Sequence, residues 1–429
     1  MGKLAIEGGC PVRNHPLPPD YPGATMMGEE EVEAVNKVIK AQSPFRFYGE
    51  NVQHTVDQLE EMMAKDLEVP YVLGVSSCTA AIVIALKALG VGYGDKVIVP
   101  SVTFIATAGA VISANAVPVF VDVDASLNLD PNDLERVMDD EVKAIIAVPL
   151  SGNPNDMDSI MAFAKKHNIY VIEDVAQSCG IKYKGRHQGT IGDIGVFSFQ
   201  MNKILTAGEG GAIATKDKNL FERIVRYHDQ GSFRAGIKNK FDIESSDIQS
   251  SFAGQNYRMS EITGAILVEQ WKKLDRIINA TKKSRKYIMD AVAEKLPNIK
   301  FQKCIDDEGH VGIAFGIQFE KPNDAKLFHD ALNSENVGCR FIYRRKPVYR
   351  FDQIFHQRTT EKDNFPFNYP FKKPVLYTEN MCPNAEYYLQ RTIQVPISPM
   401  FTDQDVHDVI TGIVKVYDTL FSKTGEKTS

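Results

Sequence analysis

The sequence predicts an α/β protein: a large domain with a mostly parallel sheet flanked by helices, followed by a smaller C-terminal α+β domain. Short apolar runs alternate with helical patterns between residues 71 and 215, and successive strand–helix–strand units form parallel sheets with helices on both faces. After two long helical patterns, strands and helices alternate again over residues 312–421. We therefore divide the chain into an N-terminal arm, a large domain, a small domain and a tail, at residues 1–25, 26–280, 281–421 and 422–429.

The composition excludes several classes of protein. A net charge of −6 disfavours a nucleic-acid backbone as partner. No apolar run is as long as a membrane span, and the N-terminus lacks the apolar segment of a signal peptide, so we expect a cytoplasmic protein that binds no membrane. The six cysteines are scattered without a CxxC pair, which argues against a zinc ribbon or an iron–sulfur cluster. We therefore expect no metal site.

The first part of the chain predicts an arm, a helix and a loop. Residues 1–25 are rich in Gly and Pro, which indicates an irregular arm that could lie across a partner subunit. From Gly28, apolar residues recur at helical spacing, with acids in the first turn, where they oppose the helix dipole. Residues 43–52 follow as a loop. In this loop, Arg46 is either a substrate contact or an ordinary surface arginine.

The next segment joins a strand to a helix through small residues. Residues 71–77 predict a strand that runs directly into a helix over residues 78–90. The junction contains Ser77, Cys78, Thr79 and Ala80, so backbone N–H groups are free at the start of the helix. Such a helix N-terminus can bind a phosphate group, although Ser and Thr there are also common helix caps.

Four more strands and two helices follow the same alternation. The strands are expected near residues 96–100, 118–123, 144–150 and 170–175, and the helices near residues 105–115 and 158–168. Judged by its residue type alone, Phe104 would belong to the hydrophobic core.

Residues 171–211 carry the pattern on which the functional interpretation rests. Asp174 ends one buried strand, and a second apolar run, residues 195–199, is followed by Lys203 and a glycine-rich turn. Ligands bind beyond the carboxyl ends of such strands. A lysine in a partly apolar site loses its proton easily and can bind an aldehyde cofactor, while a buried carboxylate suits the ring nitrogen of pyridoxal phosphate. The alternatives are a solvated lysine and a simple hairpin.

The remaining segments predict the small domain. Residues 260–296 lack Pro and show helical periodicity, which predicts one or two long helices. Strands are expected over residues 312–320 and 392–398, and helices over residues 323–336 and 402–421. A long irregular segment lies between the helix at residues 323–336 and the strand at residues 392–398. Its many aromatic residues argue against disorder. Its basic side chains either bind an anion or form a solvated face: Arg344, Arg345, Lys346 and Arg350.

The order of several motifs in the sequence resembles that of a known family. The motifs EDVAQ, GxxGDIGVFSF, a lysine and GEGGAIAT occur in this order, and together they resemble the DegT family of sugar aminotransferases, which are fold-type-I pyridoxal-phosphate enzymes. The resemblance covers the chain from about Pro22 to about Tyr417. It implies the fold-type-I architecture and pyridoxal phosphate as cofactor.

The resemblance also implies a role for each matching residue. Lys203 would bind the cofactor aldehyde, and Asp174 would hold the ring nitrogen. Phe104 would stack on the ring, and Gln177 would lie beside its hydroxyl. The remaining residues would bind the phosphate: Thr79, Ala80, Ser198 and, from the neighbouring subunit, Asn256 of the motif NYRM. Many relatives have Gly at the position of Cys78, which we also assign to the cofactor site.

Two of these matches decide the class of reaction and the assembly. In the dehydratase branches of the family a histidine replaces the lysine, so Lys203 favours amino transfer. The role of Asn256 implies a homodimer with shared active sites. His228 lies in a loop that resembles one of the family's, and it is either a packed imidazole or a pocket residue, with packing preferred.

The resemblance implies transfer of an amino group from L-glutamate or L-glutamine to a keto sugar. The segments PGATMMGEEE and SPFRFYG resemble those of relatives that aminate an oxidised octulosonic acid, giving 8-amino-3,8-dideoxy-manno-octulosonate for a surface polysaccharide. The arm resembles relatives that act on keto-cyclitols, and nucleotide-linked keto sugars remain a third class of acceptor. A dehydratase or a regulator that binds the cofactor without catalysis is the alternative to an aminotransferase.

Overall fold

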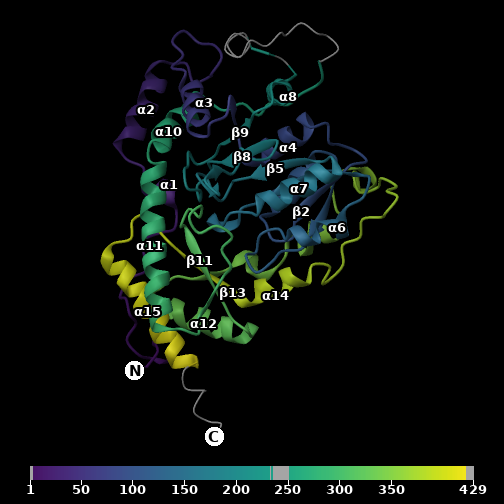
Figure 1. Ribbon diagram of the computed structural model, residues 1–429. Helices are drawn as coiled ribbons and strands as arrows, with labels where there is room; N and C mark the ends of the chain where they lie inside the picture. The colour runs from purple at the N-terminus through teal and green to yellow at the C-terminus, as the bar shows by residue number, and fades with distance from the viewer. Residues whose placement is uncertain (1–2, 232, 235–250, 422–429) are drawn as a thin grey trace.

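The computed structural model describes residues 3–231, 233–234 and 251–421, and the predicted tail at 422–429 lies outside them (Figure 1). Its largest element is a seven-stranded sheet. In spatial order the strands are β1 (Tyr71–Val75), β9 (Gly211–Thr215), β8 (Ile194–Ser198), β5 (Tyr170–Asp174), β4 (Val142–Ala147), β2 (Lys96–Pro100) and β3 (Val117–Val121). Six of the seven strands run in one direction and β9 runs in the opposite one, so the predicted mostly parallel mixed sheet is confirmed.

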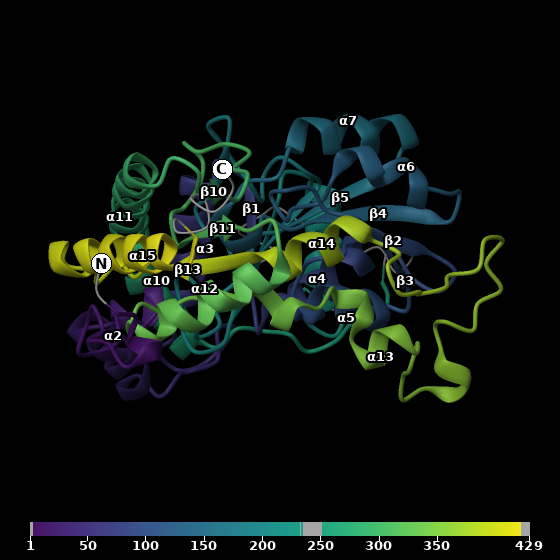
Figure 2. The ribbon, with the colours of Figure 1, turned by 90° about the horizontal axis from the view of Figure 1, so that it is seen from below.

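Helices cover both faces of this sheet. The strands are apolar at consecutive positions, and since successive side chains point to opposite faces, each face is apolar. Val97 and Val99 of β2 enter one hydrophobic cluster, whereas Ile98 between them enters another. The helices on the first face are α4 (Cys78–Ala88), α5 (Ile105–Ser113) and α8 (Lys218–His228), and those on the second are α6 (Leu134–Val137) and α7 (Met157–His167). Figure 2 shows α6 and α7 above the sheet and α4 and α5 below it. A small hairpin of β6 (Lys182–Tyr183) and β7 (Arg186–His187) follows β5.

Four helices pack together at the edge of the large sheet, and the last of them continues into the small domain. They are α2 (Glu29–Lys40), α3 (Thr55–Asp66), α10 (Glu261–Trp271) and α11 (Leu274–Lys295). The long helical run predicted over residues 260–296 is thus two helices, α10 and α11. In Figure 1, α11 extends from beside α10 down to α15 (Asp403–Phe421) and so passes from one domain to the other. Helix α3 was not among the elements predicted from the sequence.

The small domain is an antiparallel sheet with helices packed on it, which agrees with the predicted smaller α+β domain. The strand order is β10 (Lys300–Phe301), β11 (Ala314–Gln318), β13 (Thr392–Pro396) and β12 (Arg340–Phe341). A hydrophobic cluster joins this sheet to α11, α15 and α12 (Pro322–Ser334). Within the described residues, no helix is long and apolar enough to cross a membrane.

The hydrophobic clusters do not follow the single domain boundary that the sequence predicts near residue 280. Residues between Ile342 and Leu389 join the core of the large sheet, including Tyr349 and Tyr377. This segment contains α13 (Asp352–Phe355) and most of α14 (Pro383–Arg391). The buried amine of Lys96 fixes it by donating a hydrogen bond of 3.0 Å to the carbonyl of Lys373. A long segment of the predicted small domain therefore packs in the core of the large domain.

The N-terminal arm lies on the small domain of its own chain. Leu4 is buried in the small-domain cluster, and the amides of Ala5 and Val12 donate hydrogen bonds of 2.9 and 2.8 Å to the carboxylate of Glu335. The arm ends in a short helix, α1 (Pro22–Thr25), beside the large domain. Whether the arm also contacts a partner stays a prediction.

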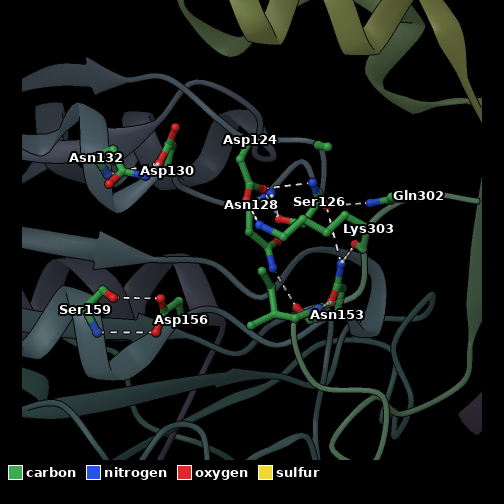
Figure 3. A network of polar contacts seen from close by, with 12 residues as sticks. Asp124, Ser126, Asn128, Asp130, Asn132, Asn153, Asp156, Ser159, Gln302 and Lys303 are labelled. Carbon is green, nitrogen blue, oxygen red and sulfur yellow. Dashed lines mark hydrogen bonds and ion pairs between the residues drawn. The ribbon is translucent and has the colours of Figure 1, made fainter.

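A polar network joins the loops after β3 and β4 to the start of the small domain (Figure 3). The side chain of Asn128 donates hydrogen bonds of 2.9 and 2.8 Å to the carbonyls of Asn153 and Pro154, and its oxygen accepts one of 3.0 Å from the amide of Leu150. Asn153 in turn donates a hydrogen bond of 2.8 Å to the carbonyl of Lys303. Because Asn128 is almost fully buried, these groups depend on one another rather than on water.

Replacing Asn128 with Ala should lower the free energy of unfolding by about 2–3 kcal/mol, because three buried backbone groups lose their partner. Chemical denaturation of the two proteins measures the difference. Asn132 is the matched control: it is exposed, and among the described residues its side chain bonds only to Asp130, so Asn132→Ala should change stability by less than about 0.5 kcal/mol. Equal effects of the two substitutions would contradict the role of the network.

Candidate active site

A cavity of about 730 Å³ lies between the two domains. Asp174 and Ser198, the last residues of β5 and β8, line it from the large sheet, and Ile313 and Gln394 line it from the small domain. The carboxyl ends of parallel strands thus form its floor, as expected for a ligand site in an open α/β sheet.

The N-terminus of α4 forms one wall of the cavity. Ser77 caps the helix, since its hydroxyl accepts a hydrogen bond of 3.1 Å from the amide of Ala80. The amides of Cys78 and Thr79 precede the first intrahelical bond, and in the described part of the chain no other group accepts from them. A side chain at Gly211 would approach the carbonyl carbon of Ser77 to 2.5 Å, so only Gly fits behind this turn. The wall can therefore offer two N–H groups and a helix dipole to an anion.

The carboxylate of Asp174 is held at the floor by several donors. Thr107 donates a hydrogen bond of 3.0 Å to one oxygen, and the amide of Ala176 donates one of 3.2 Å to the other. Burial raises the pKa of Asp174, against these hydrogen bonds and the nearby charge of Lys203. A cationic N–H group placed against Asp174 would favour its ionised form.

Lys203 lies in the turn after β8 and is half-buried. Its amide donates a hydrogen bond of 3.0 Å to the carbonyl of Gln200, and its carbonyl accepts one of 3.2 Å from the amide of Gly23 in the arm. Backbone contacts on both sides therefore hold the residue in place. Among the described residues, nothing forms a hydrogen bond or an ion pair with its amine, which is left available to a ligand in the cavity.

Gln177 is oriented by a residue from the segment after β12. Its side-chain amide donates a hydrogen bond of 2.7 Å to the hydroxyl of Tyr343. Burial raises the pKa of Tyr343, against the hydrogen bond from Gln177, so the phenol stays neutral. Tyr343, Arg344 and Arg345 have φ angles of 43°, 55° and 63°, three consecutive non-glycine residues in the left-handed region. Such strain persists only where the surroundings enforce it, and it places the phenol in the cavity wall.

The remaining predicted residues divide into those that line the cavity and those that do not. Phe104, which is 54% exposed, and Ser198 line it together with Cys78 and Thr79. Ala80 does not line it, and its amide donates to the hydroxyl of Ser77. Asn256 is exposed and lies outside the cavity of its own chain, so its contact with the cofactor would require a second subunit.

Arg46 and His228 are structural residues in this fold. The guanidinium of Arg46 is completely buried and forms hydrogen bonds of 2.8 and 2.9 Å with Glu60 and one of 2.9 Å with Asp57, so both interpretations of Arg46, as a substrate contact and as a surface arginine, are wrong. His228 is also fully buried, and burial together with the charge of Arg46 lowers its pKa to about 4. The preferred interpretation of His228 as a packed imidazole agrees with this position.

Basic residues near residue 345 contact other side chains of the protein. Arg350 pairs with Glu379 and Glu386 at 2.9 and 3.2 Å, Arg345 stacks on the ring of Phe341, and Lys346 lies 3.7 Å from Asp352. None of the four predicted basic residues, Arg344 included, lines the cavity. The arginine that does line it is Arg340, which the sequence analysis did not select.

The donor set fits a phosphorylated pyridine aldehyde. The start of α4 and Ser198 suit its phosphate, the Lys203 amine suits its aldehyde, and Asp174 suits a protonated ring nitrogen. Thr107 and Tyr343 belong to the same site, although no local sequence signal marks them. The residues present therefore match pyridoxal phosphate.

Comparison with known proteins gives the same result over most of the chain. Residues 25–414 match the DegT/DnrJ/EryC1/StrS aminotransferase family. The spore coat polysaccharide biosynthesis protein SpsC of Bacillus subtilis is 31% identical, over 94% of this chain and 97% of that protein. An L-glutamine:2-deoxy-scyllo-inosose aminotransferase of Streptomyces kanamyceticus is 34% identical, over 68% of this chain and 67% of that protein.

The solved structure of an aminotransferase from Psychrobacter cryohalolentis superimposes with a TM-score of 0.78 at 28% identity, over 92% of this chain and 98% of the other. The family match, the full-length relative and the shared fold agree with the geometry of the cavity. The chain belongs to the DegT/DnrJ/EryC1/StrS aminotransferase family.

Proposed function

We propose that this sugar aminotransferase moves an amino group from L-glutamate or L-glutamine to an oxidised octulosonic acid, giving 8-amino-3,8-dideoxy-manno-octulosonate for a surface polysaccharide. The observation that carries the amino transfer is the presence of Lys203 and Asp174 in one cavity, with the start of α4 beside them. A keto-cyclitol or a nucleotide-linked keto sugar is the alternative acceptor.

The charge of the cavity wall supports an acceptor without a nucleotide. Among the described residues that line it, Lys203 and Arg340 are cationic, while Asp20, Asp174 and Glu209 are anionic. One chain therefore supplies little positive charge for a diphosphate. The relative from Streptomyces kanamyceticus, which is named for a cyclitol acceptor, supports the same preference.

The protein's own residues have separate tasks in this reaction. When bound, pyridoxal phosphate supplies an aldehyde that carries the amino group and a ring that accepts electrons. Asp174 would keep a proton on the ring nitrogen, and the start of α4 with Ser198 would bind the phosphate. The amine of Lys203 would hold the cofactor aldehyde and, when free, would serve as the base and acid that moves a proton from the donor carbon. Phe104 would cover the ring, and Gln177, oriented by Tyr343, would lie beside its hydroxyl.

Lys203→Ala should abolish the visible absorbance that pyridoxal phosphate acquires on binding to the lysine, and it should abolish turnover. The melting temperature should stay unchanged, because no described group pairs with the amine. Spectra with the cofactor, taken before and after addition of L-glutamate or L-glutamine, test both the lysine and the donor. In the wild type a donor should convert the visible band to an ultraviolet one.

Lys216, exposed at the end of β9 and outside the cavity, provides the control variant Lys216→Ala, which should behave as the wild type. A visible band that persists in Lys203→Ala would refute the role of Lys203. A wild-type band that ignores both donors would leave a dehydratase or a non-catalytic regulator as the function.

Asn256→Ala should weaken cofactor retention, and this loss should be reversed in hybrids with Lys203→Ala. If two subunits share each site, the hybrid contains one site with an intact Lys203 from one chain and an intact Asn256 from the other. Mixing the two inactive or weakened variants, after dissociation and reassembly, should therefore restore turnover. The exposed neighbour Gln255→Ala is the control. No recovery in a mixture that contains hybrids would exclude a shared site.

A further inference from the structure

The side-chain amide of Gln394 has no partner among the residues that the structure describes, although it is almost fully buried. Only 3% of Gln394 is exposed, and the residue lines the active-site cavity from the small domain. A buried amide without a partner is unfavourable, because it has given up its hydrogen bonds to bulk water. Its place in the cavity wall indicates that a ligand supplies the missing partner.

The strand that carries Gln394 sets the direction of its side chain. Its neighbours on β13, Ile393 and Val395, are buried in the small-domain cluster. Successive side chains of a strand point to opposite faces, so Gln394 points away from this cluster and toward the cavity. Arg340, which lies opposite Gln394 on β12, is paired with Asp20. The amide of Gln394 is therefore left to the cavity.

Ser151 adds a second polar group without a partner to the same wall. It follows β4 and lines the active-site cavity, and within the described part of the chain its hydroxyl forms no hydrogen bond. Ser151 and Gln394 also both line a smaller cavity of about 20 Å³ beside the large one. Because this second cavity is so small, the two side chains lie close together.

The loop that carries Ser151 is held in a strained conformation. Ser151 has a φ angle of 52°, in the left-handed region that residues other than glycine rarely adopt. The amide before it, that of Leu150, donates a hydrogen bond of 3.0 Å to Asn128, and the amide after it, that of Gly152, donates one of 3.0 Å to Ser178. Buried side chains on both sides therefore fix the position of Ser151 in the wall.

An amide and a hydroxyl side by side match the hydroxyl groups of a sugar. The amide offers two N–H donors and a carbonyl acceptor, and a hydroxyl both donates and accepts, so either group can bond to a hydroxyl of a ligand. The reacting carbonyl of the acceptor has to approach Lys203 and Asp174 on the side of the large sheet. The wall of the small domain therefore meets a part of the acceptor that lies away from this carbonyl.

We propose that Gln394 and Ser151 bind a hydroxyl group of the acceptor, on a carbon other than the one that receives the amino group. The proposal rests on the proposed function and deepens it, since it assigns residues to the acceptor of that reaction. The pair selects a polyhydroxylated carbonyl compound over a simple keto acid. An analogue without the hydroxyl leaves both polar groups unpaired, which is how a polar site rejects such a compound.

The test follows the second half of the reaction, in which a carbonyl compound takes the amino group from the cofactor and restores its visible absorbance. The enzyme is first converted with L-glutamate or L-glutamine. It is then titrated separately with the oxidised octulosonic acid, with 2-deoxy-scyllo-inosose and with a nucleotide-linked keto sugar. The keto acid that the donor leaves behind carries no hydroxyl on its carbon chain, so it is the comparison compound in every variant.

Gln394→Leu should raise the half-saturating concentration of the sugar that reacts best by about tenfold or more, and that of the keto acid by less than about twofold. Gln394→Asn keeps an amide on a shorter side chain and should give a smaller loss. Ser151→Ala keeps the side-chain carbon in the strained loop, removes only the hydroxyl and should raise the value for the sugar several-fold. Gln404→Leu, exposed on α15 and outside the cavity, is the control and should match the wild type.

The first half of the reaction provides a second readout. Because the donor carries no sugar hydroxyl, its half-saturating concentration and limiting rate should be unchanged in Gln394→Leu and Ser151→Ala, which also shows that these variants fold and hold the cofactor. If Gln394→Leu does not fold, Gln394→Asn and Ser151→Ala provide the same comparison.

An equal loss for the sugar and the keto acid in the Gln394 variants, or no loss for the sugar, would overturn the proposal. A wild-type protein that reacts with a donor but with none of the three sugars would instead overturn the proposed function. The two failures are therefore distinguishable.

Discussion

Asp174 keeps a carboxylate where almost no water reaches it, and the rest of the site is arranged around this constraint. A buried carboxylate is costly unless donors and a positive charge compensate it. Thr107 and Ala176 supply donors and Lys203 supplies a nearby positive charge, to which a protonated ring nitrogen would add a second. The site is therefore more favourable with the cofactor than without it. The position of Asp174 at the end of β5 sets the depth of the cavity, and the start of α4 and Lys203 stand around it.

The sequence is sufficient to find the residues that follow strands. Asp174 and Lys203 come shortly after apolar runs or at their ends, and the edge rule for α/β sheets is enough to bring the two together. Thr107 and Tyr343 cannot be found in this way. Thr107 reaches Asp174 from a different strand–helix unit, 67 positions away, and Tyr343 meets Gln177 across 166 positions. Both contacts arise from the tertiary fold, and neither residue type is distinctive.

The errors have equally specific causes. The interpretation of Arg46 as a substrate contact fails because its partners, Glu60 and Asp57, lie on α3, a helix that the sequence analysis did not identify. The basic segment from Arg344 to Arg350 suggests an anion site because charge can be read from a sequence, whereas direction cannot. Its backbone is left-handed at three consecutive residues, of which Tyr343 lines the cavity while Arg344 and Arg345 do not.

The path of the chain between the two domains also limits how the enzyme can move. The arm is buried in the small domain, residues 342–389 return to the core of the large one, and the network around Asn128 and Asn153 bridges the two. A hinge needs a few unconstrained backbone positions, whereas here three separate connections would have to slide together. These connections also mean that neither domain is a self-sufficient module: a gene cut near codon 280 would leave each product without part of its own core.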